Sequence, residues 1–297
     1  MQKRQLSLAE HQAILYEILY SLDDFCKKHS IRYFLVGGSL LGAIRHGGII
    51  PWDDDIDVGM ARPEYERFIH LFQKELPEGY ELLSPELTKD YYCPFVKLAK
   101  RGTLQVEPTL IVPKEGIGIN IDIFPQDGLP GETQEDALQY HLDFRQQFQS
   151  KLWWMVVPYC QLSSWRDRFR AFRHRLRYRS LHSFRLLYSV AECYDIDRTK
   201  YFSCLVNGLY GKGEIRETKD LQNIEQKQFG ERKIPVLCDW HQYLSGLYGD
   251  YMKLPNEKQR RQHVQYAAVN LEDVKCFLKE ETLSIPLKVG GLELVTV

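Results

Sequence analysis

Residues 49–59, which read Ile-Ile-Pro-Trp-Asp-Asp-Asp-Ile-Asp-Val-Gly, carry four carboxylates within five positions. If residues 55–58 are extended, Asp55 and Asp57 lie on one face of a strand and Ile56 and Val58 on the other, because successive side chains point to opposite faces. Two like charges on one face repel each other, and a hard divalent cation offsets that repulsion. The stretch therefore predicts a metal site on a strand whose other face is buried.

Two further elements indicate phosphate chemistry. Residues 32–36 are typical of a short strand, and the turn Gly37-Gly38-Ser39 then leads into a predicted helix at 40–45. Such a turn offers backbone N–H groups and the positive end of the helix dipole to a phosphate. In the predicted strand 118–124, alternation places Asp122 opposite its isoleucine neighbours, where a carboxylate is costly unless it is paired or binds metal. Three acids and a glycine turn favour metal-assisted phosphoryl transfer over a solvated loop.

A calcium-binding EF-hand loop is the competing interpretation of these acids. Asp53, Asp55, Asp57 and Glu64 have the spacing of positions one, three, five and twelve of such a loop. Val58, however, stands where the sharp turn requires glycine, and a β-branched residue does not adopt that conformation readily. Pro63 directly before Glu64 also counts against it, so the EF-hand is excluded.

The hydrophobic patterns predict an α/β (α+β) protein with a mixed-sheet core and a mainly helical C-terminal region. A capping box formed by Ser7 and Glu10 begins the first predicted helix. The predicted helices lie at 8–28 and 63–74, and the predicted strands at 32–36, 55–58, 91–98 and 118–124. We expect residues 1–130 to form the catalytic core and residues 131–297 to pack on it as an acceptor-facing or membrane-facing region. A hairpin around Gly290-Gly291 is predicted within 283–297.

Cysteine usage and hydropathy indicate the compartment. The chain has 7 cysteines, an odd number without a Cys-x-x-Cys motif, which argues against a disulfide framework and for a reducing compartment. No uninterrupted apolar run is long enough to span a bilayer. We expect a cytoplasmic protein, located in one interpretation at the inner face of the plasma membrane.

The segment 165–185 holds eight arginines and a single acidic residue, Asp167. Three interpretations stay open for the wider stretch 152–185. It can be an amphipathic helix with a solvated basic face, or it can contact an anionic membrane, with Trp153, Trp154 and Met155 entering the interface. Nucleic-acid binding is disfavoured, because no recognition motif is present and the formal net charge is −1.

Four segments resemble the LicD/fukutin family. They are Val36-Gly-Gly-Ser-Leu-Leu-Gly-Ala-Ile-Arg-His46, Ile50-Pro-Trp-Asp-Asp-Asp-Ile-Asp57, Ile121-Asp-Ile-Phe-Pro125, and Leu247-Tyr-Gly-Asp-Tyr-Met-Lys-Leu-Pro255 with Arg260, Arg261 and His263 behind it. The resemblance implies a nucleotidyltransferase fold and transfer of phosphocholine from CDP-choline to a hydroxyl of a cell-surface glycan precursor, with release of CMP. The chain looks similar to streptococcal members of the family, which implies a lipid-linked or teichoic acid precursor as acceptor. Another CDP-activated alcohol such as CDP-ribitol, or a noncatalytic metal- or nucleotide-binding role, stays open as an alternative.

By the same resemblance, Asp55 and Asp57 hold Mg²⁺ against the donor diphosphate. One or two ions are compatible with the pattern, and Mn²⁺ is an alternative. Asp122 completes the metal site and is the best-placed general base for the acceptor hydroxyl.

Other residues are expected to bind substrate. Gly38 and Ser39 are predicted to contact phosphate, with helix capping as the equal alternative for Ser39. Arg45, His46 and Lys97 are predicted to neutralise the diphosphate, Lys97 having a strand-edge position as its alternative. Trp52, beside Asp53, is predicted to receive the choline cation on its ring. Asp250 and Tyr251 reach the site if the turn that contains them folds back over it.

Overall fold

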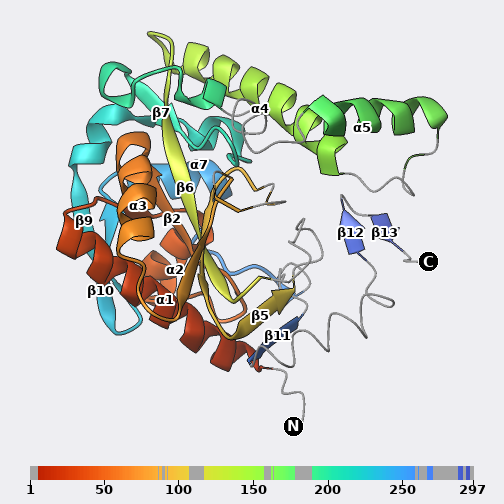
Figure 1. The fold of residues 1–297 in the computed structure, drawn as a ribbon. Coiled ribbons are helices and arrows are strands. Elements are labelled where there is room, and N and C mark those ends of the chain that lie inside the picture. Colours follow the sequence, from red (N-terminus) through yellow and green to blue (C-terminus); the bar gives the residue numbers. More distant parts are fainter. Residues whose placement is uncertain are drawn as a thin grey trace.

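The computed structural model describes residues 6–85, 87–88, 91, 93–106, 117–156, 162, 164–177, 189–257 and 260, and the short segments 266–269, 287–289 and 292–294. Figure 1 shows a mixed sheet with helices against it. The first helix, α1 (Leu8–His29), begins at the predicted capping box: the Glu10 N–H donates to Ser7 Oγ, and the Ser7 N–H donates to the Glu10 carboxylate. The α/β class predicted from the sequence is confirmed.

The main sheet is built from strands with the order β1-β2-β6-β4-β3. Its strands and the helices between them are β1 (Phe34–Leu35), α2 (Gly37–His46), β2 (Asp57–Ala61), α3 (Arg62–Lys74), β3 (Tyr80–Leu83), β4 (Val96–Lys100) and β6 (Asn120–Leu129). Strand β2 pairs with β6 in parallel, and β4 pairs with β6 antiparallel. The long strand β6, which runs through the middle of Figure 1, is therefore the element that joins the two halves of the sheet.

The predicted strand at 118–124 ends before Pro125, but β6 continues to Leu129. N–H groups alternate along a strand, and the Asp122 N–H points toward β2, where it donates to the Ile56 carbonyl. The nitrogen of Pro125 thus points to the opposite side of β6. There the pairing with β4 ends at Ile123, and the pairing with β7 (Tyr201–Ser203) begins at Asp127. Proline interrupts no ladder bond at this position, so the strand passes through it.

The chain after residue 130 contains more strands than the predicted mainly helical region. Its elements are α4 (Gln134–Val156), α5 (Trp165–Arg177), η2 (Ser189–Glu192), η3 (Ile196–Arg198), β7 (Tyr201–Ser203), η4 (Gly211–Glu214), β8 (Arg216–Glu217), η5 (Thr218–Gln222), β9 (Ile224–Phe229), β10 (Arg232–Leu237), α7 (Trp240–Tyr248), β11 (Tyr266–Val269), β12 (Leu287–Val289) and β13 (Leu292–Leu294). Strand β11 pairs with β5 (Thr103–Val106), and β12 pairs with β13 as in the predicted hairpin. Within the described residues, no helix is both long and apolar enough to cross a bilayer.

The main hydrophobic core crosses the predicted boundary at residue 130. Leu15, Leu19 and Leu22 of α1 pack in one cluster with the sheet residues Val58 and Ile121. The same cluster includes buried side chains of the C-terminal half, namely Phe229, Ile234, Val236 and Leu244. The two predicted regions thus share one core.

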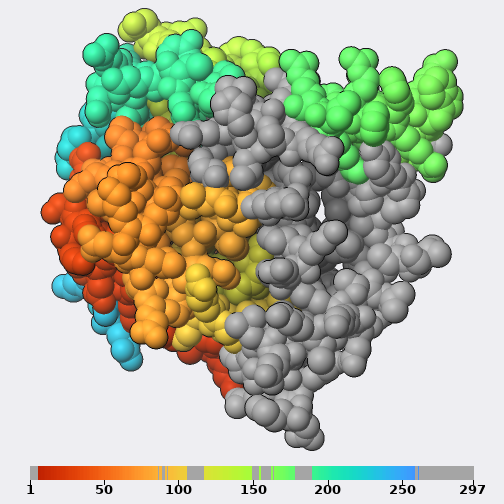
Figure 2. All heavy atoms as spheres, viewed as in Figure 1, coloured from red at the N-terminus to blue at the C-terminus, as the bar shows by residue number. Residues whose placement is uncertain are grey.

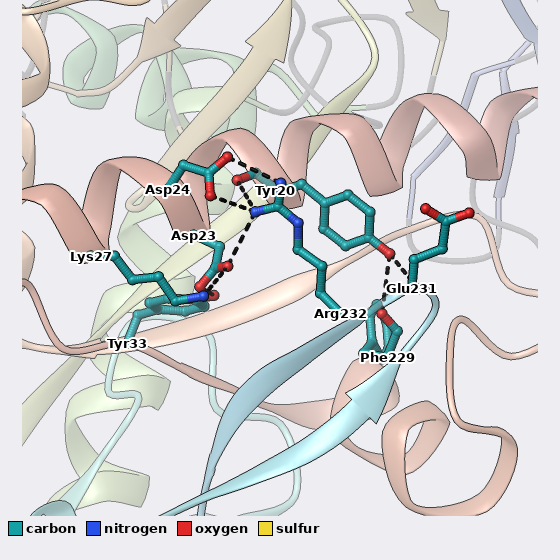
Figure 3. Close-up of polar contacts among 8 residues, drawn as sticks. All are labelled: Tyr20, Asp23, Asp24, Lys27, Tyr33, Phe229, Glu231 and Arg232. Atoms are coloured by element: carbon teal, nitrogen blue, oxygen red, sulfur yellow. Dashed lines mark hydrogen bonds and ion pairs between the residues drawn. The ribbon is translucent and has the colours of Figure 1, made fainter.

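A polar clamp fastens the β9–β10 hairpin to α1, as Figure 3 shows. Arg232 reaches the Asp24 carboxylate from both terminal nitrogens, at 2.5 and 3.1 Å, and lies 3.4 Å from the buried Asp23 carboxylate. Asp23 also accepts the Tyr33 hydroxyl at 2.9 Å and pairs with Lys27 at 2.6 Å. Asp23 is the buried centre of this cluster, and Asp24 is its exposed partner.

We predict that Asp23→Ala destabilises the protein by about 2–4 kcal/mol, because it leaves the buried Tyr33 hydroxyl without its acceptor and removes the carboxylate that pairs with Lys27. The matched variant Asp24→Ala removes an exposed ion pair and costs about 0–1 kcal/mol. Urea unfolding followed by circular dichroism measures both values. Equal losses in the two variants would contradict the assigned role of Asp23.

Candidate active site

Three neighbouring strands bring Asp57, Asp122 and Lys97 into one row. Asp57 on β2 and Lys97 on β4 are both register partners of Asp122 on β6. Directly paired residues on adjacent strands point to the same face of a sheet. The alternate residues Val58 and Ile121 lie in the core shared with α1 and α3, so the charged row faces away from those helices. The predicted placement of Asp122 opposite its isoleucine neighbours is confirmed.

Asp55 reaches this face from a loop, not from a strand. The extended strand was expected to begin at Asp55, but β2 begins two residues later, at Asp57. Asp55 and Asp57 nevertheless line the same cavity. The bond from the Asp122 N–H to the Ile56 carbonyl, 2.9 Å, holds the chain between the two aspartates against β6 and explains how a loop residue keeps the orientation expected for a strand.

Side chains of α1 hydrogen-bond to the loop that carries the acids and fix its position. Gln12 donates its side-chain amide to the carbonyls of Ile50 and Asp53, at 3.2 and 2.8 Å. The buried His11 ring contacts the Asp54 carbonyl at 2.9 Å. Asp54 itself is buried. These bonds hold the three successive carboxylates of Asp53, Asp54 and Asp55 in a small volume that their mutual repulsion would otherwise expand.

The carboxylates form a donor set that suits a hard divalent cation. Burial, followed by the charges of Asp57 and Asp53, raises the pKa of Asp55 well above its ordinary value. Among the described residues, Asp53, Asp54 and Asp55 each offer an oxygen within 4.8 Å of the others. This compact group contains Asp53 and Asp54 in addition to Asp55, whereas the predicted metal set is Asp55, Asp57 and Asp122. Oxygen-rich, negatively charged sites of this kind match the preferences of Mg²⁺ and Mn²⁺.

The glycine turn lies directly against the acids. Helix α2 begins at Gly37, earlier than the predicted start at residue 40, and Gly37 and Gly38 line the cavity. A Cβ atom on Gly37 would lie 3.3 Å from Asp57 Oδ2, and one on Gly38 would lie 3.2 Å from Asp53 Oδ2. The positive end of the α2 dipole thus lies beside the carboxylates. A phosphate bound to a cation at these carboxylates would lie at the same helix N-terminus.

Ser39 is buried and accepts a 2.8 Å hydrogen bond from the Asp57 N–H on its Oγ. The predicted cap of α2 is not its role, since the helix has Val36 at the capping position without a side-chain bond. Ser39 instead fixes the backbone of a carboxylate that lines the cavity. Its phosphate contact stays a prediction.

Lys97 lies inside the sheet, on a strand with neighbours on both sides, so the strand-edge alternative is wrong. Its side chain is 2% exposed. The ammonium donates to Asn120 Oδ1 at 2.9 Å and pairs with Asp122 Oδ1 at 2.5 Å. One buried cation therefore balances the charge of Asp122, and the predicted phosphate contact of Lys97 stays a prediction.

The acids form one wall of a cavity of about 520 Å³, and the C-terminal half of the chain forms the other. The opposite wall includes Tyr210, Glu214, Tyr243 and Tyr248. The rings of Tyr210 and Tyr248 meet edge to face with centroids 5.3 Å apart. The buried Glu214 carboxylate accepts the Leu209 and Tyr210 N–H groups, and burial raises its pKa. Of these four residues, only Tyr248 lies in one of the segments that resemble the family, and the others stand in no motif.

Several predicted substrate-binding residues gather in a second cluster. Arg45 donates to the Tyr251 carbonyl at 2.7 Å and to His46 Nε2 at 2.9 Å, and His46 packs edge to face on Trp52. Burial and the neighbouring Arg45 charge lower the pKa of His46, which suits its role as an acceptor. None of these four residues is among the described residues that line the cavity.

Trp52 already carries a cation on its ring, since the Arg260 guanidinium lies 4.4 Å from the ring centroid. Asp250 is exposed, and the buried Tyr251 bonds its hydroxyl to His241 Nδ1 at 2.6 Å. Neither lines the cavity within the described part of the chain. The turn that holds them folds onto the end of α2 near Arg45, not over the acids.

Comparison with known proteins identifies the family. The domain family described as LicD/FKTN/FKRP, nucleotidyltransferase domain, matches residues 30–155. The lipopolysaccharide cholinephosphotransferase LicD of Haemophilus influenzae is 30% identical over 273 residues, which are 90% of this chain and 99% of that protein. The chain therefore belongs to the LicD family. The ribitol 5-phosphate transferase FKRP of human and mouse is 70% identical over 30 residues, 10% of this chain and 6% of that protein. Similarity to named transferases supports enzyme activity for this chain.

We predict that Gly37→Ala weakens Mn²⁺ binding about fivefold or more. The added methyl group meets Asp57 at 3.3 Å and stands on a residue with φ +54°, so the carboxylate must move. Gly47→Ala is the matched control, because Gly47 has φ +68° but nothing within 4 Å of the added Cβ. Both variants lose roughly 1–2 kcal/mol of stability from backbone strain. Electron paramagnetic resonance of free Mn²⁺ measures the binding, and equal affinity in the two variants would contradict the role of Gly37.

Proposed function

We propose that this protein transfers phosphocholine from CDP-choline to a hydroxyl of a cell-surface glycan precursor of the lipid-linked or teichoic acid type, and releases CMP. The observation that carries the proposal is the near full-length similarity to a lipopolysaccharide cholinephosphotransferase. The cavity supports it, since a row of carboxylates beside a helix N-terminus faces a wall of tyrosines. Such a site suits a diphosphate at one end and an organic cation at the other.

In this mechanism, Asp55 and Asp57 would hold one or two Mg²⁺ ions, and Asp53 lines the same cavity. The bound metal supplies positive charge against the diphosphate oxygens. The backbone N–H groups of Gly37 and Gly38 orient the same oxygens at the start of α2. The acceptor hydroxyl oxygen forms a bond to the phosphorus of phosphocholine as the bond from that phosphorus to the CMP oxygen breaks, and CMP keeps the electron pair.

Asp122 takes the proton of the acceptor hydroxyl. Its position supports this role, because it lines the cavity beside Asp57 while Lys97 balances its charge at Oδ1. Lys97 acts here as a positioning residue that holds the carboxylate toward the acceptor. General bases of this kind must lie within hydrogen-bond reach of the proton that they remove.

The choline group binds at the tyrosine wall. A quaternary ammonium is attracted by aromatic faces, and Tyr210 and Tyr248 present two rings at an angle beside the buried Glu214 carboxylate. Trp52, the ring predicted from the sequence, is replaced in this role because Arg260 already lies over it. The acids and the tyrosines line the same cavity, so one donor molecule can contact both.

A different activated alcohol is the second candidate. The short match of 30 residues to ribitol 5-phosphate transferases favours CDP-ribitol as the alternative donor. A noncatalytic binding role is less well supported, since the acids, the glycine turn and the buried lysine are all present in one cavity.

Incubation with a panel of CDP-alcohols and Mg²⁺ tests the donor. We expect CMP release with CDP-choline and a glycan acceptor, and its loss on chelation with EDTA. Asp57→Asn should lower the rate by about a thousandfold or more, because it removes a charge that holds the metal without changing the shape of the side chain. Asp250→Asn, which removes the same charge from an exposed aspartate that does not line the cavity within the described part of the chain, is the matched control. CMP release from CDP-ribitol and not from CDP-choline would show that CDP-ribitol is the donor. Full turnover by Asp57→Asn would overturn the metal assignment.

Tyr210 tests the head-group site, because it is half exposed and its replacement should leave the fold intact. We expect Tyr210→Ala to raise KM for CDP-choline about tenfold, the effect of roughly 1–2 kcal/mol of lost cation–π attraction. Tyr210→Phe keeps the ring and should stay within about twofold of the natural protein. Binding of CMP, which lacks choline, should be equal in all three proteins by calorimetry. Weaker CMP binding in Tyr210→Ala would place this residue at the nucleotide instead.

A further inference from the structure

Helix α5 presents an apolar stripe to solvent. Its large side chains at positions 165, 169, 172 and 176 recur at helical spacing, so they share one face. Trp165 is 73%, Phe169 55%, Phe172 52% and Leu176 60% exposed. Figure 2 shows α5 as the green corner at the upper right of the molecule. Four exposed large apolar residues on one helix face form a patch that marks an interaction site.

The stripe is exposed although the helix is packed on its opposite side. Ala171 is fully buried in a small cluster with Leu162 and Trp154 of α4. The Trp154 ring also stacks on His174 and lies 5.0 Å from the Arg170 guanidinium. Helix α5 is thus fastened to α4 by one face, and the face with the aromatic residues points outward.

Arginines flank the stripe on both sides. The helix carries six arginines and one aspartate, and at 3.6 residues per turn Arg168 and Arg175 fall on one flank and Arg166 and Arg173 on the other. Beside the second flank lies a groove of about 570 Å³ whose lining includes Arg166, Arg170, Arg173 and Arg177. A groove with four guanidinium groups suits an anionic phosphate headgroup.

We infer that α5 docks on an anionic membrane surface, with the stripe in the headgroup region and the arginines on the lipid phosphates. A helix with tryptophan, phenylalanine and leucine on one face and arginine beside them has the composition of helices that lie in the membrane interface. A second copy of the chain fits the same face poorly, because a two-fold contact through α5 would bring two sets of arginines together. The proposed acceptor chemistry is not needed for this inference, which stands on the helix alone.

Flotation of the full chain with vesicles tests the proposal. We expect binding to vesicles of phosphatidylcholine mixed with phosphatidylglycerol, weaker binding to phosphatidylcholine alone, and loss of binding as salt rises. Phe169→Ser with Phe172→Ser should lower the partition coefficient about tenfold or more by removing apolar area from the interface. Arg166→Gln with Arg173→Gln should lower it by a similar factor on the anionic vesicles only.

The matched control is Arg198→Gln with Lys219→Gln, which removes the same charge from exposed sites outside α5. This pair should bind vesicles as the natural protein does. Equal binding by the α5 variants and the control would overturn the proposal. The proposal would also be overturned if light scattering showed that Phe169→Ser with Phe172→Ser converts a dimer to a monomer while vesicle binding stays unchanged. That result would mean that a second copy of the chain covers the stripe. Vesicle binding is measured without CDP-choline or glycan acceptor, so its outcome does not depend on whether the proposed transfer reaction occurs.

Discussion

The repulsion among five carboxylates gathered on one face of the sheet is the constraint on which the rest of the site depends. Asp53, Asp54 and Asp55 are adjacent in the chain, and Asp57 and Asp122 are brought beside them by strand pairing. Each neighbour of this group opposes the repulsion in its own way. Helix α1 holds the loop carbonyls, Lys97 balances one charge from within the sheet, and the N-terminus of α2 turns its dipole toward the acids. A divalent cation completes this balance in the proposed function.

The same strand β6 places the acids and connects the two halves of the molecule. Its first half pairs with β2 and β4 and presents Asp122, and its second half pairs with β7 of the C-terminal region. Pro125 occurs at the one position between the β4 and β7 pairings where the missing N–H costs no ladder bond. The wall of tyrosines is therefore held at a fixed place relative to the acids by a single continuous strand. This explains why a division at residue 130 would cut through the site.

The acidic wall could be predicted from the sequence because its determinants are local. The alternation around Asp122 fixes side-chain directions over a few residues and agrees with the structure. Gly37 and Gly38 lie beside the acids as expected, although they form the first turn of α2 and not a turn before it. The strand start at Asp57 was missed, because the pairing of Ile56 with β6 gives a loop the geometry of a strand. Tyr210 and Glu214 could not be predicted, since they reach the cavity through contacts across the whole chain and stand in no recognisable motif. Arg45 and Trp52 illustrate the converse, as proximity to the acids in sequence did not bring their side chains into the cavity.

In the proposed function, the two walls divide the transfer chemistry from the recognition of the donor alcohol. The acids, the glycines and Lys97 are proposed to act on the diphosphate whatever alcohol it carries, and the tyrosine wall is proposed to meet the part that differs between choline and ribitol. On this proposal, a change of donor requires a change of the tyrosine wall while the row of carboxylates stays as it is. The physical reason is that a cation needs aromatic faces and a carboxylate, whereas a polyol needs hydrogen-bond donors and acceptors in their place.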